Sequence, residues 1–264
     1  MRILKKVLAY TLLIILIAGS SFLLWVSQRY TVPIIMYHHV ANVEKRRSDT
    51  VSPQNFERHM QFLADHQYEV ISFSKLIEGM KKGKQFSRKT IVLTFDDGYR
   101  NNYENAFPIL KKYGFPAIIF MVSDWMGAEG FLTLDQLKEM QTQGIEIGAH
   151  SKTHAYLPDL SYDEQKLQIG GSKKDLEKKL KESVFYFAYP VGGFNNQIIG
   201  LVKEAGFEAA CTTNRGFVRE NKDIFELKRV RVSDRDNSDF LLLFKFSGYY
   251  NALREGKKPD SRGY

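Results

Sequence analysis

The sequence predicts an α/β fold in which a mostly parallel β-sheet is covered by helices. Short apolar segments alternate with amphipathic stretches over residues 31–264, and strands that alternate with helices build parallel sheets. Unusual polar residues directly follow several of the apolar segments, as they do at the active-site rim of a barrel. With about seven or eight such units, the sheet can close into a barrel, and an open doubly wound sheet is the alternative.

The predicted strands are short runs rich in Val, Ile, Phe and Ala. In chain order they cover Val32–Val40, Glu69–Ser72, Thr90–Phe95, Ala117–Val122, Gly144–Ala149, Val184–Tyr189, Phe207–Cys211 and Leu227–Val232. No internal repeat or Gly/Ser linker divides them. A chain of this length therefore suits one domain with a large core.

Three predicted helices have clear start signals. Ser52 and Pro53 open the first, with Ser at the N-cap and Pro at the first helical position. The stretches Thr133–Gln136 and Ser161–Glu164 resemble capping boxes that open two more. His59 and His66 fall on the first of these helices, where we expect a structural or exposed role.

Residues 1–30 form a separate N-terminal segment. Val7–Val26 is a run of 20 uncharged residues preceded by Arg2, Lys5 and Lys6. As a helix this run would span about 30 Å, the thickness of a bilayer core, and the basic flank places the N-terminus in the cytoplasm. We expect a retained membrane anchor rather than a cleaved signal peptide, with residues 31–264 outside the cell or, if the segment is cleaved, secreted.

Composition excludes several classes of protein. The chain is 44% hydrophobic and 26% charged, which is ordinary for a globular domain. Its single cysteine, Cys211, excludes an intramolecular disulfide framework and a multi-cysteine metal site. Four of the 38 basic residues and no acidic residue lie in residues 1–30, which leaves a net charge of +4 on the rest. That charge does not indicate a nucleic-acid partner, and no protein partner can be inferred.

Asp96 and Asp97 end the apolar run that begins at Thr90, and Gly98 follows them. Because neighbouring strand residues face opposite sides, we expect different roles for the two carboxylates, one binding a cation and the other handling protons. A bound cation would also relieve their mutual repulsion. The alternative is an ordinary Asp-Asp-Gly turn.

His150 and His154 follow the apolar run Gly144–Ala149. Residues four apart on a helical turn can hold one metal ion, although two surface histidines are the usual reading of such a pair. One Asp and two His with an open position form a catalytic metal site. This donor set favours Zn, with Co, Mn, Fe or Ni also possible.

Two further strand ends carry candidate residues. The Tyr189 backbone N–H, at the start of Tyr189-Pro190-Val191-Gly192, could act as an oxyanion donor, and the alternative is a plain Pro-Gly turn. At the end of the first strand, His38 and His39 face opposite ways, so we expect at most one to enter the site.

These motifs together resemble the NodB-like polysaccharide deacetylases, carbohydrate esterase family four. The resemblance rests on Leu93–Gly98, His150–His154 and Tyr189-Pro190-x-Gly192, in that order, and covers most of residues 31–264. It implies a distorted (β/α) barrel of about seven strands and metal-dependent removal of acetyl groups from carbohydrate. The opening Pro33–His38 is similar to the branch that acts on β-1,6-linked poly-N-acetylglucosamine.

The resemblance also implies roles for individual residues. Asp96 matches the family's catalytic base, and Asp97, His150 and His154 match its metal ligands. The Arg that commonly opens the third motif is replaced by Ala188, and Arg229 or Arg231 is expected to orient the base instead. The family's late Leu-x-His motif is missing, so His38 is the candidate general acid.

The expected reaction is metal-assisted hydrolysis of an acetamide, with Asp96 as base, the Tyr189 N–H at the oxyanion and His38 protonating the sugar amine. Tyr37, Trp125 and Phe194 are candidate sugar-stacking residues, with core packing as the alternative for each. The expected substrate is an acetylated extracellular polysaccharide. Peptidoglycan deacetylation and a catalytically silent, membrane-tethered glycan-binding protein are the alternatives.

Overall fold

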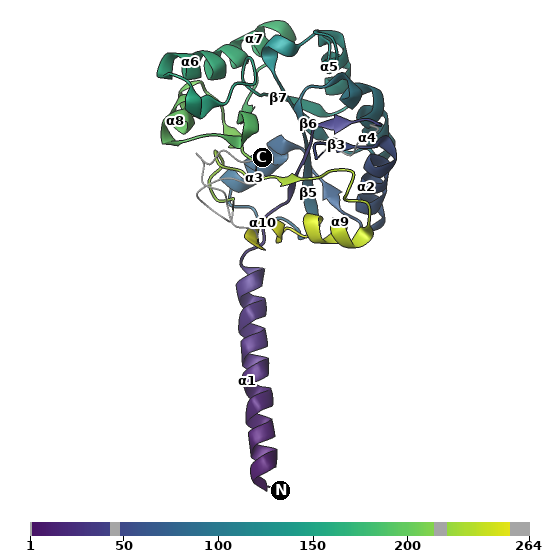
Figure 1. Cartoon of the computed structure of the whole chain (residues 1–264), viewed down its shortest axis with the longest axis vertical. Helices are drawn as coiled ribbons and strands as arrows, with labels where there is room; N and C mark the ends of the chain where they lie inside the picture. The colour runs from purple at the N-terminus through teal and green to yellow at the C-terminus, as the bar shows by residue number, and fades with distance from the viewer. Residues whose placement is uncertain (1, 43–47, 214–220, 254–264) are drawn as a thin grey trace.

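The computed structural model describes residues 2–42, 48–213 and 221–253, apart from some side chains of the first helix. The domain assignment 31–264 therefore includes segments that lie outside the described residues. Helix α1 (Arg2–Ser27) projects from the rest of the chain (Figure 1). Within the described part of the chain, no helix combines the length and apolar character that crossing a bilayer requires.

A parallel sheet forms the centre of the fold. Along the sheet the strands follow the order β10-β1-β5-β6-β7-β8-β9, and β4 pairs with the start of β5. The last strand, β10, lies beside the first, β1, and the other strands follow one another in sequence order. This order excludes the doubly wound alternative. The bounds are β1 Ile34–Tyr37, β4 Glu69–Val70, β5 Thr90–Asp97, β6 Ala117–Met121, β7 Ile145–Ala149, β8 Tyr186–Ala188, β9 Ala209–Cys211 and β10 Val230–Arg231.

One segment connects the two edges of this sheet. The Leu227 carbonyl accepts a hydrogen bond from Thr212 at the end of β9, and the Arg229 N–H donates to the Thr213 carbonyl. The next two residues, Val230 and Arg231, pair with β1. The seven strands therefore curve into a barrel-like sheet, and the prediction of an α/β fold with about seven parallel strands is confirmed.

Each of the eight predicted strands overlaps an observed strand, and most of the observed strands are shorter than predicted. One short pair was not predicted: β2 (His39–Val40) lies parallel to β3 (Thr50–Val51). Each strand of that pair has only two residues, too few for a pattern of alternating hydrophobicity to be recognised. The pair matters because it fixes the chain immediately after His38.

Helices cover the outside of the sheet (Figure 1). The three predicted start signals are confirmed, since the Ser52 hydroxyl accepts from the Asn55 N–H and capping boxes form at Thr133 and Ser161. The α-helices after α1 are α2 Pro53–Asp65, α3 Phe73–Lys81, α4 Phe107–Tyr113, α5 Leu134–Thr142, α6 Tyr162–Lys166, α7 Ser172–Leu180, α8 Asn196–Glu204, α9 Asp239–Phe246 and α10 Tyr250–Leu253. Shorter turns are η1 Asn102–Ala106, η2 Ser123–Trp125, η3 Leu157–Asp159, η4 Leu167–Gly171 and η5 Pro190–Gly192.

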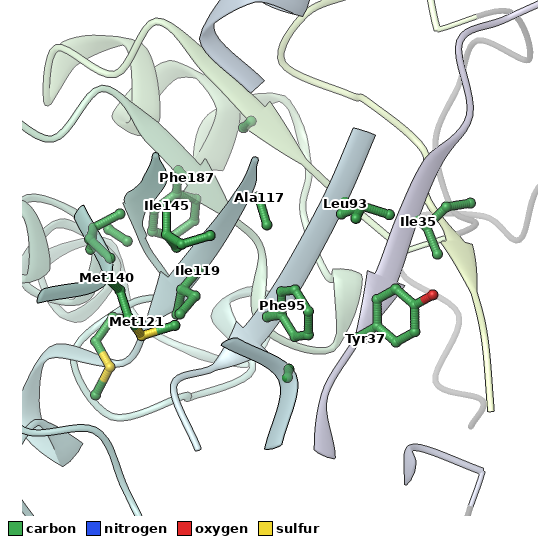
Figure 2. Packing of buried hydrophobic residues seen from close by; sticks show 14 of the residues in the cluster. Ile35, Tyr37, Leu93, Phe95, Ala117, Ile119, Met121, Met140, Ile145 and Phe187 are labelled. Atoms are coloured by element: carbon green, nitrogen blue, oxygen red, sulfur yellow. The ribbon is translucent and has the colours of Figure 1, made fainter. Parts of the chain in front are cut away.

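Alternate strand residues pack on opposite faces of the sheet. Ile35, Tyr37, Leu93 and Phe95 belong to one buried cluster, together with side chains of α2 and α4 (Figure 2). The intervening residues, such as Val92, form a second cluster with α3. This alternation follows from the pleat of a strand, and it leaves the carboxyl ends of the strands as the place where polar side chains meet.

His59 on α2 is a buried structural histidine, as the sequence led us to expect. Its Nε2 lies 2.7 Å from the Asp236 carbonyl oxygen, which can only accept, so Nε2 carries the proton. Its Nδ1 therefore accepts from the Tyr37 hydroxyl at 3.1 Å. Burial lowers the pKa of His59 from 6.5 to about 4, so this histidine stays neutral at physiological pH.

The depressed pKa of His59 predicts how stability depends on pH. The unfolded chain takes up a proton near pH 6.5 and the folded protein only near pH 4. The free energy of unfolding should therefore fall as the pH decreases from about 6.5 to about 4, by up to about 3 kcal/mol. Urea unfolding in EDTA across this range should show a smaller pH dependence for His59→Gln. An unchanged slope in that variant would contradict the assignment.

Candidate active site

The predicted site residues lie where β1, β5 and β7 end. Asp96 and Asp97 are the last two residues of β5, His150 directly follows β7, and His38 directly follows β1. These strands are parallel, and β1 and β5 are neighbours. Their carboxyl ends therefore bring the polar residues to one rim of the sheet.

Asp97, His150 and His154 form one cluster. The Nε2 atoms of His150 and His154 lie 3.4 Å and 3.2 Å from Asp97 Oδ1, and one donor atom from each of the three residues lies within 4.8 Å of the others. Asp97 and His150 are buried, whereas His154 is half-buried. Three residues from two separate motifs thus converge on one point, as the sequence predicts.

The donor atoms of this cluster suit a cation. His150 Nδ1 lies 2.7 Å from the Ala188 carbonyl oxygen, so that nitrogen carries a proton, and His150 Nε2 faces Asp97. Asp97 Oδ1 is buried and accepts no hydrogen bond from the described residues. Burial lowers the pKa of His150, but the carboxylates of Asp96 and Asp97 outweigh it and raise this pKa above its usual value, so the pair attracts positive charge, either a proton on His150 or a bound cation. One carboxylate and two imidazoles are a donor set that Zn²⁺ accepts.

The charges of the cluster follow from burial and from neighbouring groups. Burial opposes ionisation of Asp97, but the imidazoles of His150, His38 and His154 outweigh it and hold the Asp97 pKa well below its usual range. Burial and the neighbouring His150 lower the pKa of His154 to about 4. His154 is therefore neutral at physiological pH, the state in which an imidazole can donate a lone pair to a metal.

Both aspartates face the rim because the backbone turns sharply at Asp97. Its φ of 72° breaks the alternation of the strand, which would otherwise send the two carboxylates to opposite faces. Gly98 follows with a φ of 81°, and a Cβ there would lie 2.0 Å from Met121 Sδ. Glycine adopts this left-handed conformation without strain and leaves the Met121 side chain in place.

Asp96 is held by a buried arginine. Arg229 Nη1 and Nη2 donate to Asp96 Oδ1 and Oδ2, each at 2.6 Å, and Arg229 is only 1% exposed. Burial of Asp96 raises its pKa, but the Arg229 guanidinium more than offsets this, so the net shift is downward. Asp96 therefore stays ionised and fixed in orientation.

Arg229 is itself fixed by the strands around it. Its Nε donates to the Thr212 carbonyl and its Nη1 also donates to the Thr94 hydroxyl. The sequence analysis missed both threonines. Thr94 lies two residues before Asp96 on the same strand face, and this spacing could have pointed to it. Thr212 binds Arg229 through its backbone carbonyl, so its side chain gives no sequence signal.

Known proteins with similar sequences or structures identify the family. The profile of the polysaccharide deacetylase family matches residues 83–210. YxkH of Bacillus subtilis (strain 168), which is assigned to the polysaccharide deacetylases, is 34% identical over 202 residues, 76% of this chain and 71% of its own length. The chain belongs to the polysaccharide deacetylase family.

Two further relatives agree with this assignment. The poly-beta-1,6-N-acetyl-D-glucosamine N-deacetylase of Staphylococcus aureus (strain MSSA476) is 31% identical over 201 residues, 70% of this chain and 68% of that protein. The Streptococcus pyogenes deacetylase PplD, solved in complex with acetate, has a TM-score of 0.75 at 28% identity. That match covers 81% of this chain and 97% of PplD. The present chain is thus a polysaccharide deacetylase, and the resemblance noted from its motifs is confirmed.

The deacetylase carries Ala188 where the motif resemblance leads us to expect an arginine, and Arg229 binds Asp96 instead. Arg231, the other candidate, is exposed, and the arginine hydrogen bonds to Asp96 come from Arg229. On a regular strand, residues two positions apart, such as Arg229 and Arg231, would share a face. The segment containing Arg229 instead bonds to β9 before it pairs with β1, so the two arginines have different surroundings.

His38 lies across the site from Arg229. Its Nε2 is 4.0 Å from Asp96 Oδ2, and its Nδ1 is buried without a hydrogen-bond partner in the described residues. Burial lowers the pKa of His38, which the charges of Asp96 and Asp97 only partly counteract. His38 is therefore neutral in the resting protein and close enough to Asp96 to exchange a proton through a small rearrangement.

Three predicted roles are corrected by the structure. The Tyr189 N–H donates to the Cys211 carbonyl at 2.9 Å within the sheet, so it cannot also bind an oxyanion. Tyr37 and Phe194 are fully buried, so neither can stack on a sugar. Tyr37 packs on Phe95 at a ring distance of 5.2 Å (Figure 2), and Phe194 stacks on Tyr189 at 4.9 Å. Both rings therefore pack in the core, which was the alternative interpretation of these two residues.

The loop after Tyr189 offers another backbone donor. Gly192 and Gly193 donate their N–H groups to the Tyr189 and Pro190 carbonyls, and the Val191 N–H has no acceptor among the described residues. Val191 has a φ of 56°, which is rare for a β-branched residue and marks stored strain. We therefore move the expected oxyanion donor from Tyr189 to Val191.

Trp125 is the one predicted sugar-contacting residue that lies beside the cluster. It is half-buried in η2, and its ring stacks on His154 at a centroid distance of 5.5 Å. Its role in substrate binding stays a prediction.

The buried pair between Arg229 and Asp96 predicts a large effect of removing the arginine. Arg229→Met should destabilise the fold by about 3–5 kcal/mol, because Asp96 is left buried without a partner. Arg229→Lys should keep more stability but lose most acetate release, because an ammonium group cannot bind both carboxylate oxygens. The matched control Arg231→Met should change the free energy of unfolding by less than about 0.5 kcal/mol. Equal effects at the two positions would refute the assignment.

Proposed function

We propose that this protein is a metal-dependent N-deacetylase of an extracellular polysaccharide related to poly-β-1,6-N-acetylglucosamine. The observation that carries the proposal is the convergence of Asp97, His150 and His154 beside an Asp96 that Arg229 fixes. The similarity to a Staphylococcus aureus enzyme named for that polymer supports the choice of substrate.

In this proposal Asp97, His150 and His154 hold one divalent ion, preferably Zn²⁺. A bound ion would supply Lewis acidity to the acetyl carbonyl and to the attacking water. The chain contributes the orientation of its donors. The Ala188 carbonyl fixes the tautomer of His150, as hydrogen-bonding partners of metal-binding histidines commonly do. Trp125 covers one face of His154.

Asp96 is the general base. Each of its oxygens accepts one hydrogen bond from Arg229 and keeps a second lone pair for the proton of the attacking water. Arg229 holds the carboxylate in one orientation, which is a precondition for efficient proton transfer. The Val191 N–H stabilises the negative charge that develops on the acetyl oxygen.

His38 is the general acid. Because burial keeps it neutral at rest, its proton must arrive during the reaction, and Asp96 at 4.0 Å is the neighbouring source. The proton that Asp96 takes from water passes to His38 and then to the sugar nitrogen as the C–N bond breaks. The products are acetate and a protonated glucosamine unit.

Residues 1–30 serve, in this proposal, as an export segment, either a signal peptide or an anchor, that directs the catalytic domain to the outside of the cell. The support is the 20-residue uncharged run with a basic flank, together with the exposed apolar side chains along α1, such as Ile14 and Leu16. Such an anchor would place the enzyme near an exported polymer.

The proposed reaction predicts acetate release from β-1,6-linked N-acetylglucosamine oligomers. Chelation should abolish release and Zn²⁺ should restore it. Asp96→Asn should remove nearly all activity, because an amide cannot accept the proton, and it should also lower the free energy of unfolding, because the buried Arg229 loses its charged partner. Release by Asp96→Asn at the wild-type rate would refute the role of the base. Release only from peptidoglycan fragments would identify peptidoglycan as the substrate in place of the β-1,6-linked polymer. No release from any acetylated glycan would indicate a glycan-binding protein rather than an enzyme.

The role of His38 predicts a separate effect. His38→Ala should lower the turnover number by about 10²–10⁴-fold, because an amine is a poor leaving group without a proton donor. The loss should be smaller on an activated aryl acetate ester, whose leaving group needs no proton. His39→Ala provides the control next in the chain. A full rate with His38→Ala on the oligomers would remove His38 from the mechanism and leave the deacetylase proposal standing.

A further inference from the structure

The loop that carries the two candidate metal-ligating histidines has a strained backbone. Ser151 and His154 have φ values of 62° and 61°, in the left-handed region that non-glycine residues rarely adopt. Such residues cost about 1–3 kcal/mol each and persist only where the surroundings fix them. The conformation of His150–His154 must therefore be held by contacts outside the loop.

One side of the loop is held by the end of β6. The N–H groups of Ser123 and Asp124 donate to the carbonyls of Ser151 and Lys152, at 3.2 Å and 3.1 Å. These bonds extend the pairing of β6 and β7 past the last strand residues. The His154 N–H donates to the Ser151 hydroxyl at 3.0 Å, which leaves the N–H groups of Lys152 and Thr153 to another partner.

That partner is a single side chain, Gln168. Its Oε1 accepts hydrogen bonds from the N–H groups of both Lys152 and Thr153, at 3.1 Å and 3.0 Å. Its Nε2 donates to the Thr153 hydroxyl at 2.9 Å. One amide thus makes three hydrogen bonds to two of the three residues between the histidines.

Gln168 lies in an irregular turn. Residues Leu167–Gly171 (η4) form a π-helical insertion between α6 and α7, a type of distortion that is frequent at functional sites. The same turn accommodates Lys152, since a Cβ on Gly171 would lie 2.8 Å from Lys152 Cδ. Lys152 in turn pairs with Asp124 at 3.0 Å and also with Asp175 on α7. The π-helical turn and the histidine loop are therefore built against each other.

We propose that Gln168 is a positioning residue that holds the His150–His154 loop in its strained, ligand-ready conformation. The inference rests on the proposed metal site and adds a residue that no motif contains. Without the amide, the Lys152 and Thr153 N–H groups bond to water, and the loop relaxes toward unstrained backbone angles. His154 then leaves the position 3.2 Å from Asp97.

Zinc affinity tests this inference, measured by competition with a chromophoric chelator. Gln168→Ala and Gln168→Asn should weaken Zn²⁺ binding about tenfold or more, the range typical of outer partners of metal ligands. Gln168→Glu should stay near the wild-type affinity, because a carboxylate oxygen still accepts from both N–H groups. The control is Gln141→Ala, which removes a side-chain amide of α5 that donates to Glu182 and should leave the affinity unchanged. All four variants should keep the thermal midpoint within a few degrees.

Hydrogen exchange without metal provides the second measurement. The amides of Lys152 and Thr153 should exchange faster in Gln168→Ala than in the wild-type protein, and at the wild-type rate in Gln168→Glu. Unchanged zinc affinity and exchange in Gln168→Ala would overturn the inference, and so would equal losses in the Ala and Glu variants. If the wild-type protein binds no zinc, the proposed function fails, and the exchange rates alone decide the role of Gln168.

Discussion

The bidentate ion pair between Arg229 and Asp96 is the interaction on which the active site and the sheet both depend. Two adjacent carboxylates at the end of a fully buried strand would repel each other and pay a large desolvation penalty. Arg229 neutralises one of them from inside the fold. It lies on the segment that bonds to β9 and then pairs with β1. The residue that orients the proposed base is thus also part of the connection between the two edges of the sheet.

Neutralising Asp96 separates the roles of the two aspartates. Asp96 has a permanent positive partner, so it stays ionised and available to water. Asp97 faces two imidazoles whose neutral forms offer lone pairs, so its charge is left for an ion to balance. The left-handed backbone at Asp97 makes this division possible, because it points both carboxylates to one rim. Strain recurs at Ser151, His154 and Val191, which are all at this rim, as expected where function fixes the backbone.

The sequence was informative where local pattern determines structure. Apolar runs predicted every strand of the main sheet, and the helix starts at Ser52, Thr133 and Ser161 followed from capping chemistry. The convergence of Asp97 with His150 followed from the rule that parallel strands end at one rim.

The sequence was less informative where a role depends on a backbone hydrogen bond or on burial. Nothing in the sequence shows that the Tyr189 N–H bonds to Cys211 or that Tyr37 faces the core. Gln168 escaped notice because it lies 15 and 16 residues from its partners in the His150–His154 motif and is part of no motif itself.

The division of labour between the adjacent aspartates can be measured directly by titrating Zn²⁺ into the wild-type protein, Asp96→Asn and Asp97→Asn by isothermal calorimetry. We expect one ion per wild-type chain. Asp97→Asn should weaken binding by at least about a hundredfold, since a charged ligand is lost, whereas Asp96→Asn should stay within about tenfold of the wild-type affinity. If both substitutions abolish binding equally, or if Asp96→Asn has the larger effect, then Asp97, His150 and His154 do not form the metal site, and the roles assigned to the two aspartates are wrong.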